Sequence, residues 1–376
     1  MNYAKPLFAI ASAMLLFSCQ KKVDTTQSTT PQQQVVLDLS DTEGVHYFPT
    51  HPSFPNNTFE DDKAILGRVL FYDKHLSANN AIACASCHRQ ELAFADDVAF
   101  SRGFEGRLTG RNSMPIQDLM PSFPINSVKT FQFGRLFWDG REQNLKNLVL
   151  KPVNNHVEMG VSDVTTLPAK LNELPYYADL VEKAFGTREL NTDNISEAVA
   201  YFLMAISADS SRFNKDMITN QEFNALERMG QTLFNSKYEC GNCHRISFGQ
   251  YTNEVVANIG LDKTDKDLGV GALNIKTAIE GGTYGAFRAP NLKNVAKTAP
   301  YMHDGRFKTL EEVIDHYSEG IQDNPNLDQR LKRDGKPMRM QITEDDKKAI
   351  VAFLNTLTDY DMLTDPKLSN PFKTVQ

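Results

Sequence analysis

Long apolar segments are nearly absent from this 376-residue sequence. One apolar run, at residues 6–17, is too short to span a bilayer comfortably, and no later run is long enough to cross a membrane. Basic residues are in the minority, since 40 Lys and Arg stand against 47 Asp and Glu, so the composition does not indicate a nucleic-acid partner. No segment shows strand-like alternation over the length of the helical patterns described below.

Cysteine is also scarce, and its placement is informative. Four of the five cysteines form two Cys-x-x-Cys-His motifs, at 84–88 and 240–244. This spacing is typical of c-type haem attachment, in which two thiols add to the haem vinyl groups and the histidine binds the iron. A four-cysteine zinc site or a pair of redox dithiols would use the same cysteine pairs, but neither explains the histidine that follows each pair. We therefore predict two covalently bound haem c groups, held by Cys84, Cys87 and His88 and by Cys240, Cys243 and His244.

The fifth cysteine, Cys19, ends a candidate targeting signal. Lys5 supplies its positive charge, the short apolar run follows, and a small residue, Ser18, directly precedes the cysteine. The arrangement resembles a bacterial lipoprotein signal; the alternative is an ordinary signal peptide with a chance cysteine. We expect residues 1–18 to be removed and Cys19 to anchor the protein in the periplasm. Residues 19–45 are expected to form a flexible tether, because residues 24–34 are polar and low in complexity.

The rest of the chain is predicted to be mainly α-helical, with long loops. Apolar residues at helical spacing mark residues 195–206, 220–234, 310–317 and 343–357. Ser196 is a candidate cap of the first helix, and Thr343, followed by acidic residues, suits the start of the last. Because the two histidine-containing motifs lie far apart, we predict an N-terminal haem domain at 46–215 and a C-terminal haem domain at 216–376.

Further motifs give the chain a resemblance to a known family. Phe-Trp-Asp-Gly-Arg stands at 137–141, Val-Glu-Met at 157–159 and Ala-Pro-Tyr-Met-His-Asp-Gly-Arg at 299–306. With the two haem motifs, they resemble the bacterial di-haem cytochrome c peroxidases, which include the MauG type of methylamine-utilisation enzymes. The resemblance runs from about Thr58 to Leu357. It implies two cytochrome-c-like domains with a calcium ion at their interface.

The resemblance also implies that the two haems differ. His88 is then the proximal ligand of a peroxide-reactive haem, and His244 that of an electron-transfer haem. Glu158 matches a distal carboxylate that moves protons during peroxide cleavage, although a surface glutamate is the alternative. Trp138, the single tryptophan, matches a residue between the haems, and a core aromatic would also suit it. Arg288 matches a basic residue that neutralises haem propionates.

The calcium ligands follow from the same resemblance. They are the Asn112 side chain and the backbone carbonyls of Thr298 and Pro300, completed by water, and such an oxygen shell suits calcium. His303, in the His-Asp-Gly motif, is expected to be structural.

Two departures from the pattern concern the peroxide-reactive haem. Conventional members carry a histidine in a movable loop before an Arg-Asn pair, and it caps this haem until the other haem is reduced. Here the loop before Arg111 and Asn112 has no histidine, and Phe104 falls near the expected place. We therefore expect peroxide to react without prior reduction. A distal glutamine usual in the family falls near Leu148, and His156 is a candidate replacement or a surface histidine.

A third departure concerns the electron-transfer haem. Conventional members bind its iron through a methionine in the helix after the His-Asp-Gly motif, and Tyr317 stands there in this chain, as in MauG-type proteins. A phenolate stabilises ferric iron more than a thioether does, so it lowers the reduction potential. Met338 and Met340 remain the alternative ligands, with Tyr317 then a core residue.

Three functions follow as hypotheses. The first is a peroxidase that reduces hydrogen peroxide with electrons from a periplasmic donor such as a cytochrome c or a cupredoxin. The second is a MauG-like enzyme that uses peroxide to oxidise a protein or an organic molecule. The third is a di-haem electron carrier without substrate chemistry, for which a distal carboxylate has no use. By analogy with the family, a homodimer is expected.

Overall fold

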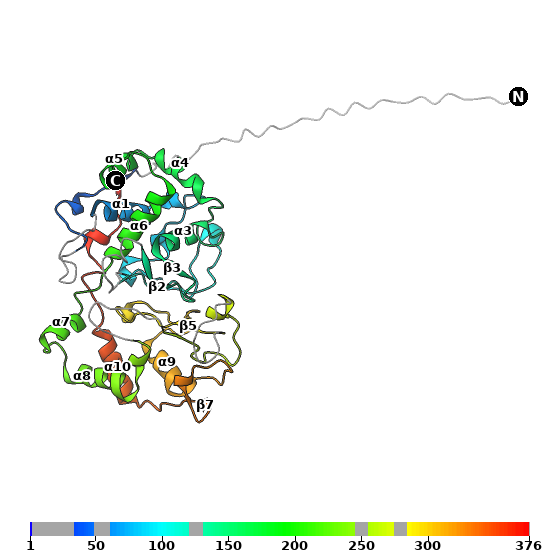
Figure 1. Ribbon diagram of the computed structural model, residues 1–376, viewed down its shortest axis with the longest axis vertical. Coiled ribbons are helices and arrows are strands. Elements are labelled where there is room, and N and C mark those ends of the chain that lie inside the picture. The colour runs from blue at the N-terminus through cyan, green and yellow to red at the C-terminus, as the bar shows by residue number, and fades with distance from the viewer. Residues whose placement is uncertain (2–33, 49–60, 120–130, 245–254, 274–283, 376) are drawn as a thin grey trace.

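The computed structural model describes Met1 and residues 34–48, 61–119, 131–244, 255–273 and 284–375. These residues form two helical lobes, stacked along the long axis and joined by long loops (Figure 1). The α-helices are α1 (Asp61–Tyr72), α3 (Leu145–Asn154), α4 (Leu167–Asn172), α5 (Tyr177–Phe185), α6 (Thr192–Ala205), α7 (Arg212–Thr219), α8 (Ala225–Thr232), α9 (Leu310–Asp315) and α10 (Glu344–Asn355). The mainly α prediction is confirmed.

The strands are short and occur in four antiparallel pairs within the described residues. They are β1 (Gln34–Leu37) with β8 (Phe372–Val375), β2 (Gln132–Leu136) with β3 (Glu142–Asn144), β4 (Val256–Ala257) with β5 (Phe287–Arg288), and β6 (Lys332–Arg333) with β7 (Lys336–Pro337). Within the same residues, no helix is long and apolar enough to cross a membrane.

Each lobe is built on one close crossing of two helices. In the first lobe, a Cβ atom on Gly67 of α1 would overlap the carbonyl oxygen of Ala198 in α6. In the second lobe, a Cβ atom on Gly230 of α8 would overlap the carbonyl oxygen of Ala349 in α10. A phenylalanine four residues after each alanine packs beside the glycine. The two lobes therefore repeat one packing motif, and in each lobe a Cys-x-x-Cys-His motif follows the glycine-bearing helix.

Two buried apolar clusters match these crossings. The first contains residues from α1, α3, α5 and α6, and the second contains residues from α7, α9, α10 and the π-helical turn Leu233–Lys237 that follows α8. The chain after α10 returns to the first cluster, where Met362, Leu363 and Leu368 are buried. The domain boundary between residues 215 and 216 stays a prediction. The predicted division did not anticipate that the C-terminal segment packs on the first cluster.

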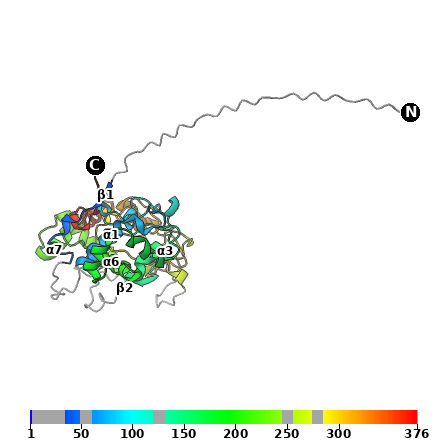
Figure 2. The ribbon, with the colours of Figure 1, turned by 90° about the horizontal axis from the view of Figure 1, so that it is seen from above.

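The last part of the predicted tether is folded, and that part of the prediction is wrong. Residues 34–37 form β1 and pair with β8 near the C-terminus (Figure 2). The buried guanidinium of Arg68 in α1 binds both carboxylate oxygens of Asp41, and its Nε donates to the carbonyl oxygen of Ser369 at 2.6 Å. Residues 2–33, including the signal and Cys19, lie outside the described residues.

The four helix predictions are confirmed with shifted ends. The first is α6, capped by Asn191 and not by Ser196. The second is α8, whose cap Asn224 forms a capping box with Glu227. The third is α9, which continues into a π-helical turn at His316–Gly320. The fourth is α10, with Thr343 as the predicted cap.

The helix crossing gives a first prediction. Gly67→Ala should lower the free energy of unfolding by about 1–3 kcal/mol, because the added methyl group forces α1 and α6 apart. Gly110→Ala is the matched control, since a Cβ atom there meets no atom within 4 Å. Denaturant unfolding followed by circular dichroism measures both variants. Equal midpoints for the two variants would contradict the proposed tight crossing.

Candidate haem sites

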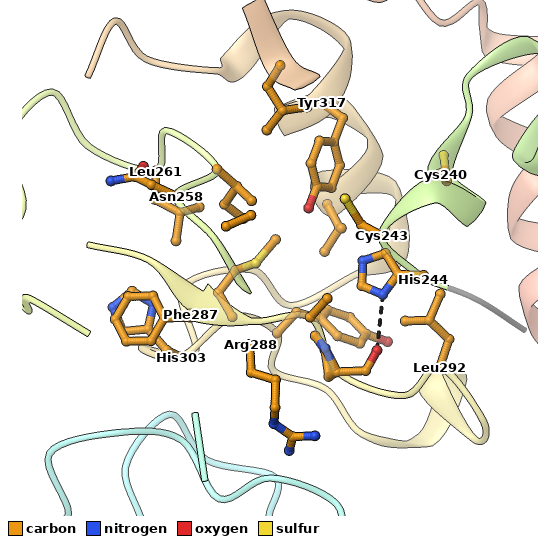
Figure 3. A pocket seen from close by; sticks show the side chains of 18 of the residues that line it. Cys240, Cys243, His244, Asn258, Leu261, Phe287, Arg288, Leu292, His303 and Tyr317 are labelled. Carbon is orange, nitrogen blue, oxygen red and sulfur yellow. Dashed lines mark hydrogen bonds between the residues drawn. The ribbon is translucent and has the colours of Figure 1, made fainter. Parts of the chain in front are cut away.

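The second Cys-x-x-Cys-His motif lines a cavity of about 620 Å³. Cys240 opens a short 3-10 turn, and the His244 backbone N–H donates to the Cys240 carbonyl at 2.9 Å. The His244 ring is held by a 3.0 Å hydrogen bond between Nδ1 and the carbonyl oxygen of Pro290 (Figure 3). A carbonyl can only accept, so Nδ1 carries the proton and Nε2 keeps its lone pair for iron. The cavity and its ligand-ready imidazole fit a covalently attached haem.

Tyr317 projects into this cavity from the π-helical turn, with its hydroxyl group directed inward (Figure 3). In the described part of the chain, the Tyr317 hydroxyl has no hydrogen-bond partner, whereas the hydroxyl of Tyr301 in the same cavity donates to the carbonyl of Val295 at 3.0 Å. Burial raises the pKa of Tyr317, so a phenolate there needs a positive partner such as ferric iron. Met338 and Met340 line the cavity too, and Met340 also packs against the second apolar cluster.

The first motif has the same local geometry. The His88 backbone N–H donates to the Cys84 carbonyl at 3.0 Å, and His88 Nδ1 lies 2.8 Å from the carbonyl oxygen of Phe94. Burial raises the pKa of Cys84 to about 12 and that of Cys87 to about 11. A redox dithiol needs a lowered thiol pKa, so these environments do not suit that alternative. Among the described residues, no three His, Cys, Asp or Glu side chains gather as a metal site.

Glu158 lies beside the first motif. Its carboxylate is near enough to Cys84 and Cys87 to add to the rise of their pKa values, after burial. The Glu158 side chain is partly buried, and burial raises its own pKa, while the positive charge of Arg141 opposes the rise. The structure therefore brings the predicted distal carboxylate to the first haem site and favours its protonated form more than water would.

The loop that lacks the family's histidine packs on the turn that carries Glu158. The Phe104 backbone N–H donates to the carbonyls of Val157 and Glu158, at 2.8 and 2.9 Å. A Cβ atom on Gly103 would overlap the Val157 carbonyl, and one on Gly160 would lie 2.5 Å from the Phe104 ring. The two glycines thus permit an approach that larger residues would block, and the loop is closely seated on this turn.

Leu148 and His156, the two residues considered for the place of the family's distal glutamine, are not placed as buried hydrogen-bonding side chains. Leu148 packs against the first apolar cluster. His156 is exposed, and its backbone carbonyl accepts a hydrogen bond from Arg107 at 3.1 Å.

Trp138 joins the two lobes. Its Nε1 donates to the Asn112 carbonyl at 2.8 Å, and its own carbonyl accepts from the Arg288 backbone N–H at 2.8 Å. Arg288 Nε also donates to the Phe137 carbonyl at 3.1 Å. Trp138 and Arg288 both line the second cavity. Trp138 therefore connects the first lobe to the second cavity, and Arg288 brings a positive charge to that cavity; their roles toward the haems stay predictions.

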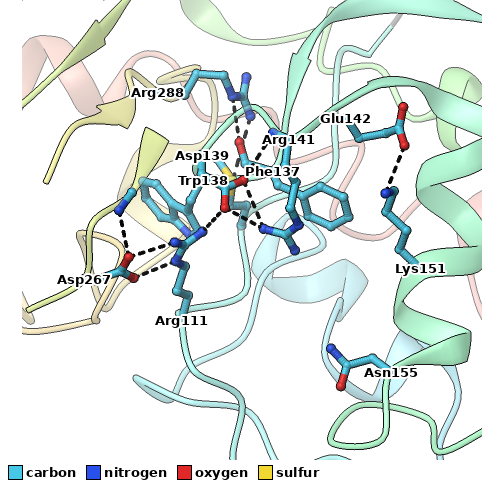
Figure 4. A network of polar contacts seen from close by, with 12 residues as sticks. Arg111, Phe137, Trp138, Asp139, Arg141, Glu142, Lys151, Asn155, Asp267 and Arg288 are labelled. Atoms are coloured by element: carbon cyan, nitrogen blue, oxygen red, sulfur yellow. Dashed lines mark hydrogen bonds and ion pairs between the residues drawn. The ribbon is translucent and has the colours of Figure 1, made fainter. Parts of the chain in front are cut away.

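A charged network that the motifs did not predict lies beside Trp138 (Figure 4). Arg111 binds both carboxylate oxygens of Asp267, at 2.7 and 2.8 Å, and Asp139 at 2.6 Å. Arg141 also binds Asp139 and stacks 3.8 Å from the centre of the Phe137 ring. Such bidentate contacts fix the orientation of the arginine relative to the carboxylate, so they hold the loop that carries Arg111 against the second lobe.

The three predicted calcium residues face one cavity. Asn112, Thr298 and Pro300 line the second cavity together. Asn112 Nδ2 donates to the Val98 carbonyl at 3.0 Å, which leaves the side-chain oxygen available as a ligand. His303 stacks on Phe287 with a centroid distance of 3.8 Å, in agreement with a structural role.

Two such sites in one mainly helical chain define a di-haem c-type protein, and comparisons narrow the class. A family described as di-haem cytochrome c peroxidase matches residues 61–222, and the cytochrome c family matches residues 228–358. Methylamine utilization protein MauG of Methylorubrum extorquens is 30% identical over 304 residues, or 80% of this chain and 79% of that protein. Cytochrome-c peroxidase IdrP1 of a Pseudomonas species is 27% identical over 354 residues, covering 86% and 89% of the two chains.

A solved structure indicates the same family. The crystal structure of a MauG-like protein associated with microbial copper homeostasis matches with a TM-score of 0.70 and 30% identity, over 84% of this chain and 95% of that chain. The chain belongs to the di-haem cytochrome c peroxidase family, which contains both MauG-type proteins and cytochrome c peroxidases. It is an oxidoreductase with two haem cofactors.

The second cavity gives a prediction about the iron ligand. Tyr317→Phe should change the optical and electron paramagnetic resonance spectra of one ferric haem, because the phenyl ring has no ligand atom. Met338→Leu and Met340→Leu should leave both spectra unchanged. Tyr301→Phe is the matched control, since the Tyr301 hydroxyl in the same cavity is already bound to Val295. An unchanged spectrum for Tyr317→Phe, with a changed one for either methionine variant, would reverse the assignment.

Proposed function

We propose that the protein reduces hydrogen peroxide to water at the haem attached to Cys84 and Cys87, with electrons from a small periplasmic redox protein such as a c-type cytochrome. The single observation that carries this proposal is the half-buried Glu158 beside the first haem motif, with a raised pKa. When bound, this haem supplies the iron that exchanges electrons with peroxide. The overall change consumes one peroxide, two electrons and two protons and releases two water molecules.

Glu158 is assigned the proton transfer. Its carboxylate takes a proton from one peroxide oxygen and returns it to the other, which then leaves as water. A carboxyl group in partly apolar surroundings suits both steps, because its raised pKa brings the two protonation states closer in energy near neutral pH. An electron carrier has no use for such a group, so Glu158 favours the enzyme.

Replacement of this carboxyl group tests the proposal. Glu158→Gln should slow the reaction with peroxide by about 10²–10⁴-fold, because an amide cannot accept the proton. The wild-type rate should fall as pH falls through the raised pKa of Glu158, since the base form is lost there, and the variant should lack this dependence. Stopped-flow absorbance measures both. The exposed Glu173→Gln is the control; an equal rate for the two variants would sink the assignment.

Electron supply is assigned to the second haem. His244 and Tyr317 face its cavity from different elements, and Trp138 and Arg288 lie between this cavity and the first lobe. The alternative, MauG-like oxidation of a protein or organic substrate, is favoured by Tyr317, because a phenolate stabilises oxidised iron. It is also favoured by the closely seated loop at Phe104, which holds no histidine.

The same loop gives a prediction about activation. Phe104→His should slow the reaction of the fully oxidised protein with peroxide by about tenfold or more, since an imidazole near the iron competes for the open position. Leu108→His is the control, because Leu108 lies in the same loop and is exposed. Rapid mixing of each protein with peroxide measures the rate. A wild-type protein that ignores peroxide until it is reduced would contradict the proposed open site.

Three further assignments belong to this proposal. A calcium ion is held by the Asn112 side chain and the carbonyls of Thr298 and Pro300, which line one cavity. Cys19 carries lipid and anchors the protein in the periplasm, a compartment that suits covalent haem attachment. The protein forms a homodimer, by analogy with its family.

A further inference from the structure

We propose that Asn155 is a positioning residue that fixes the orientation of the Glu158 carboxyl group and decides which of its oxygens carries the proton. The inference rests on the proposed role of Glu158. Asn155 directly follows α3, and its Nδ2 donates to Glu158 Oε1 at 3.0 Å. A carboxyl group that exchanges protons with peroxide must present one particular oxygen, so a fixed partner on the other oxygen has a direct consequence for the reaction.

The orientation of the Asn155 amide is set by a second hydrogen bond. Its side-chain oxygen accepts from the backbone N–H of Val157 at 2.8 Å. Because a backbone N–H can only donate, the oxygen of the amide must face Val157, and the NH₂ group must face Glu158. Glu158 Oε1 is therefore an acceptor, and the proton of the neutral acid belongs on Oε2.

The turn around Asn155 is anchored by its backbone as well. The Asn155 carbonyl accepts from the backbone N–H groups of Met159 and Gly160, at 3.1 and 2.8 Å. The Phe104 loop also packs on this turn, at Gly160. Asn155 thus joins the end of α3 to the Glu158 side chain, within a turn on which the loop is also seated, so the carboxyl group has little freedom to rotate.

The hydrogen bond also acts on the charge of Glu158. Donation to the carboxylate favours its ionised form and so opposes the rise of its pKa that burial causes. Loss of the donor should therefore raise the pKa of Glu158 further. The base form would then disappear at a higher pH than in the wild-type protein.

Asn155→Asp removes the hydrogen bond to Glu158 but keeps the acceptor that holds the turn. Aspartate has the same shape and keeps an acceptor for the Val157 N–H, but it loses the donor to Glu158 and places a like charge beside it. The neighbouring Asn154→Asp is the matched control. Asn154 donates to the carbonyls of Val161 and Ser162, at 2.8 and 3.0 Å, and its exposed side chain introduces the same charge one residue away.

The experiment measures the peroxide rate against pH by stopped flow on the haem-loaded variants. It also records an optical pH titration of the resting oxidised protein, which needs no turnover. We expect Asn155→Asp to lower the rate at neutral pH by about 10–100-fold and to move the acid limb and the optical transition to higher pH. Asn154→Asp also loses hydrogen bonds to backbone carbonyls but none to Glu158, so it should keep the wild-type pH profile. If Asn155→Asp fails to take up haem, Asn155→Ser replaces it.

Each result has a distinct meaning. If Glu158→Gln is slow but both asparagine variants share the wild-type pH profile, the positioning role is wrong and the proposed function stands. Equal shifts in the two aspartate variants also overturn the positioning role, because general charge then explains them. If Glu158→Gln reacts like the wild type, the proposed role of Glu158 fails, and that of Asn155 fails with it.

Discussion

Both haem sites depend on one hydrogen bond, from the Nδ1 of a histidine to a backbone carbonyl. His88 makes it to Phe94 and His244 makes it to Pro290. In each case the bond fixes the ring and leaves Nε2 as the free nitrogen, so the imidazole is prepared for iron before any haem is attached. In each lobe the Cys-x-x-Cys-His turn follows the glycine-bearing helix of the close crossing, α1 with α6 or α8 with α10.

The two lobes share this frame and differ in the side chain that lies near each Cys-x-x-Cys-His motif. The first lobe presents a carboxyl group, Glu158, which can move protons but is a poor permanent ligand for an iron that must bind peroxide. The second lobe presents the phenol of Tyr317, which has no other hydrogen-bond partner in the described residues and can reach into the cavity as a ligand. One packing motif, used twice, therefore supports two kinds of chemistry, because the difference lies in side chains outside the repeated frame.

Local signals could be read from the sequence, and contacts between distant segments could not. The helix at 343–357 is visible because Thr343 and the acidic residues after it form a recognisable start. The folding of residues 34–45 is not visible, because it depends on pairing with residues 372–375 at the other end of the chain. The haem motifs are local patterns as well, whereas the contact of Arg111 with Asp267 joins residues far apart in the sequence. Asn155 lies only three residues before Glu158, but asparagine is common at helix ends, so the sequence did not single it out. Only the hydrogen bond between the two side chains connects Asn155 with the candidate site.

The two lobes are joined by a contact that is fixed by several hydrogen bonds around Trp138. Trp138 is held at both ends, since its indole N–H binds Asn112 in one lobe and its carbonyl binds the backbone of Arg288 in the other. Asn112 is in turn bound to the His303 carbonyl, so the loop of the first lobe and the His-Asp-Gly turn of the second cannot separate without losing several hydrogen bonds. A rigid contact keeps the distance between the two redox sites constant, and it needs no rearrangement before each electron passes. The proposed open haem would need no moving part to couple it to the other haem, and both this fixed contact and the closely seated loop at Phe104 suit that proposal.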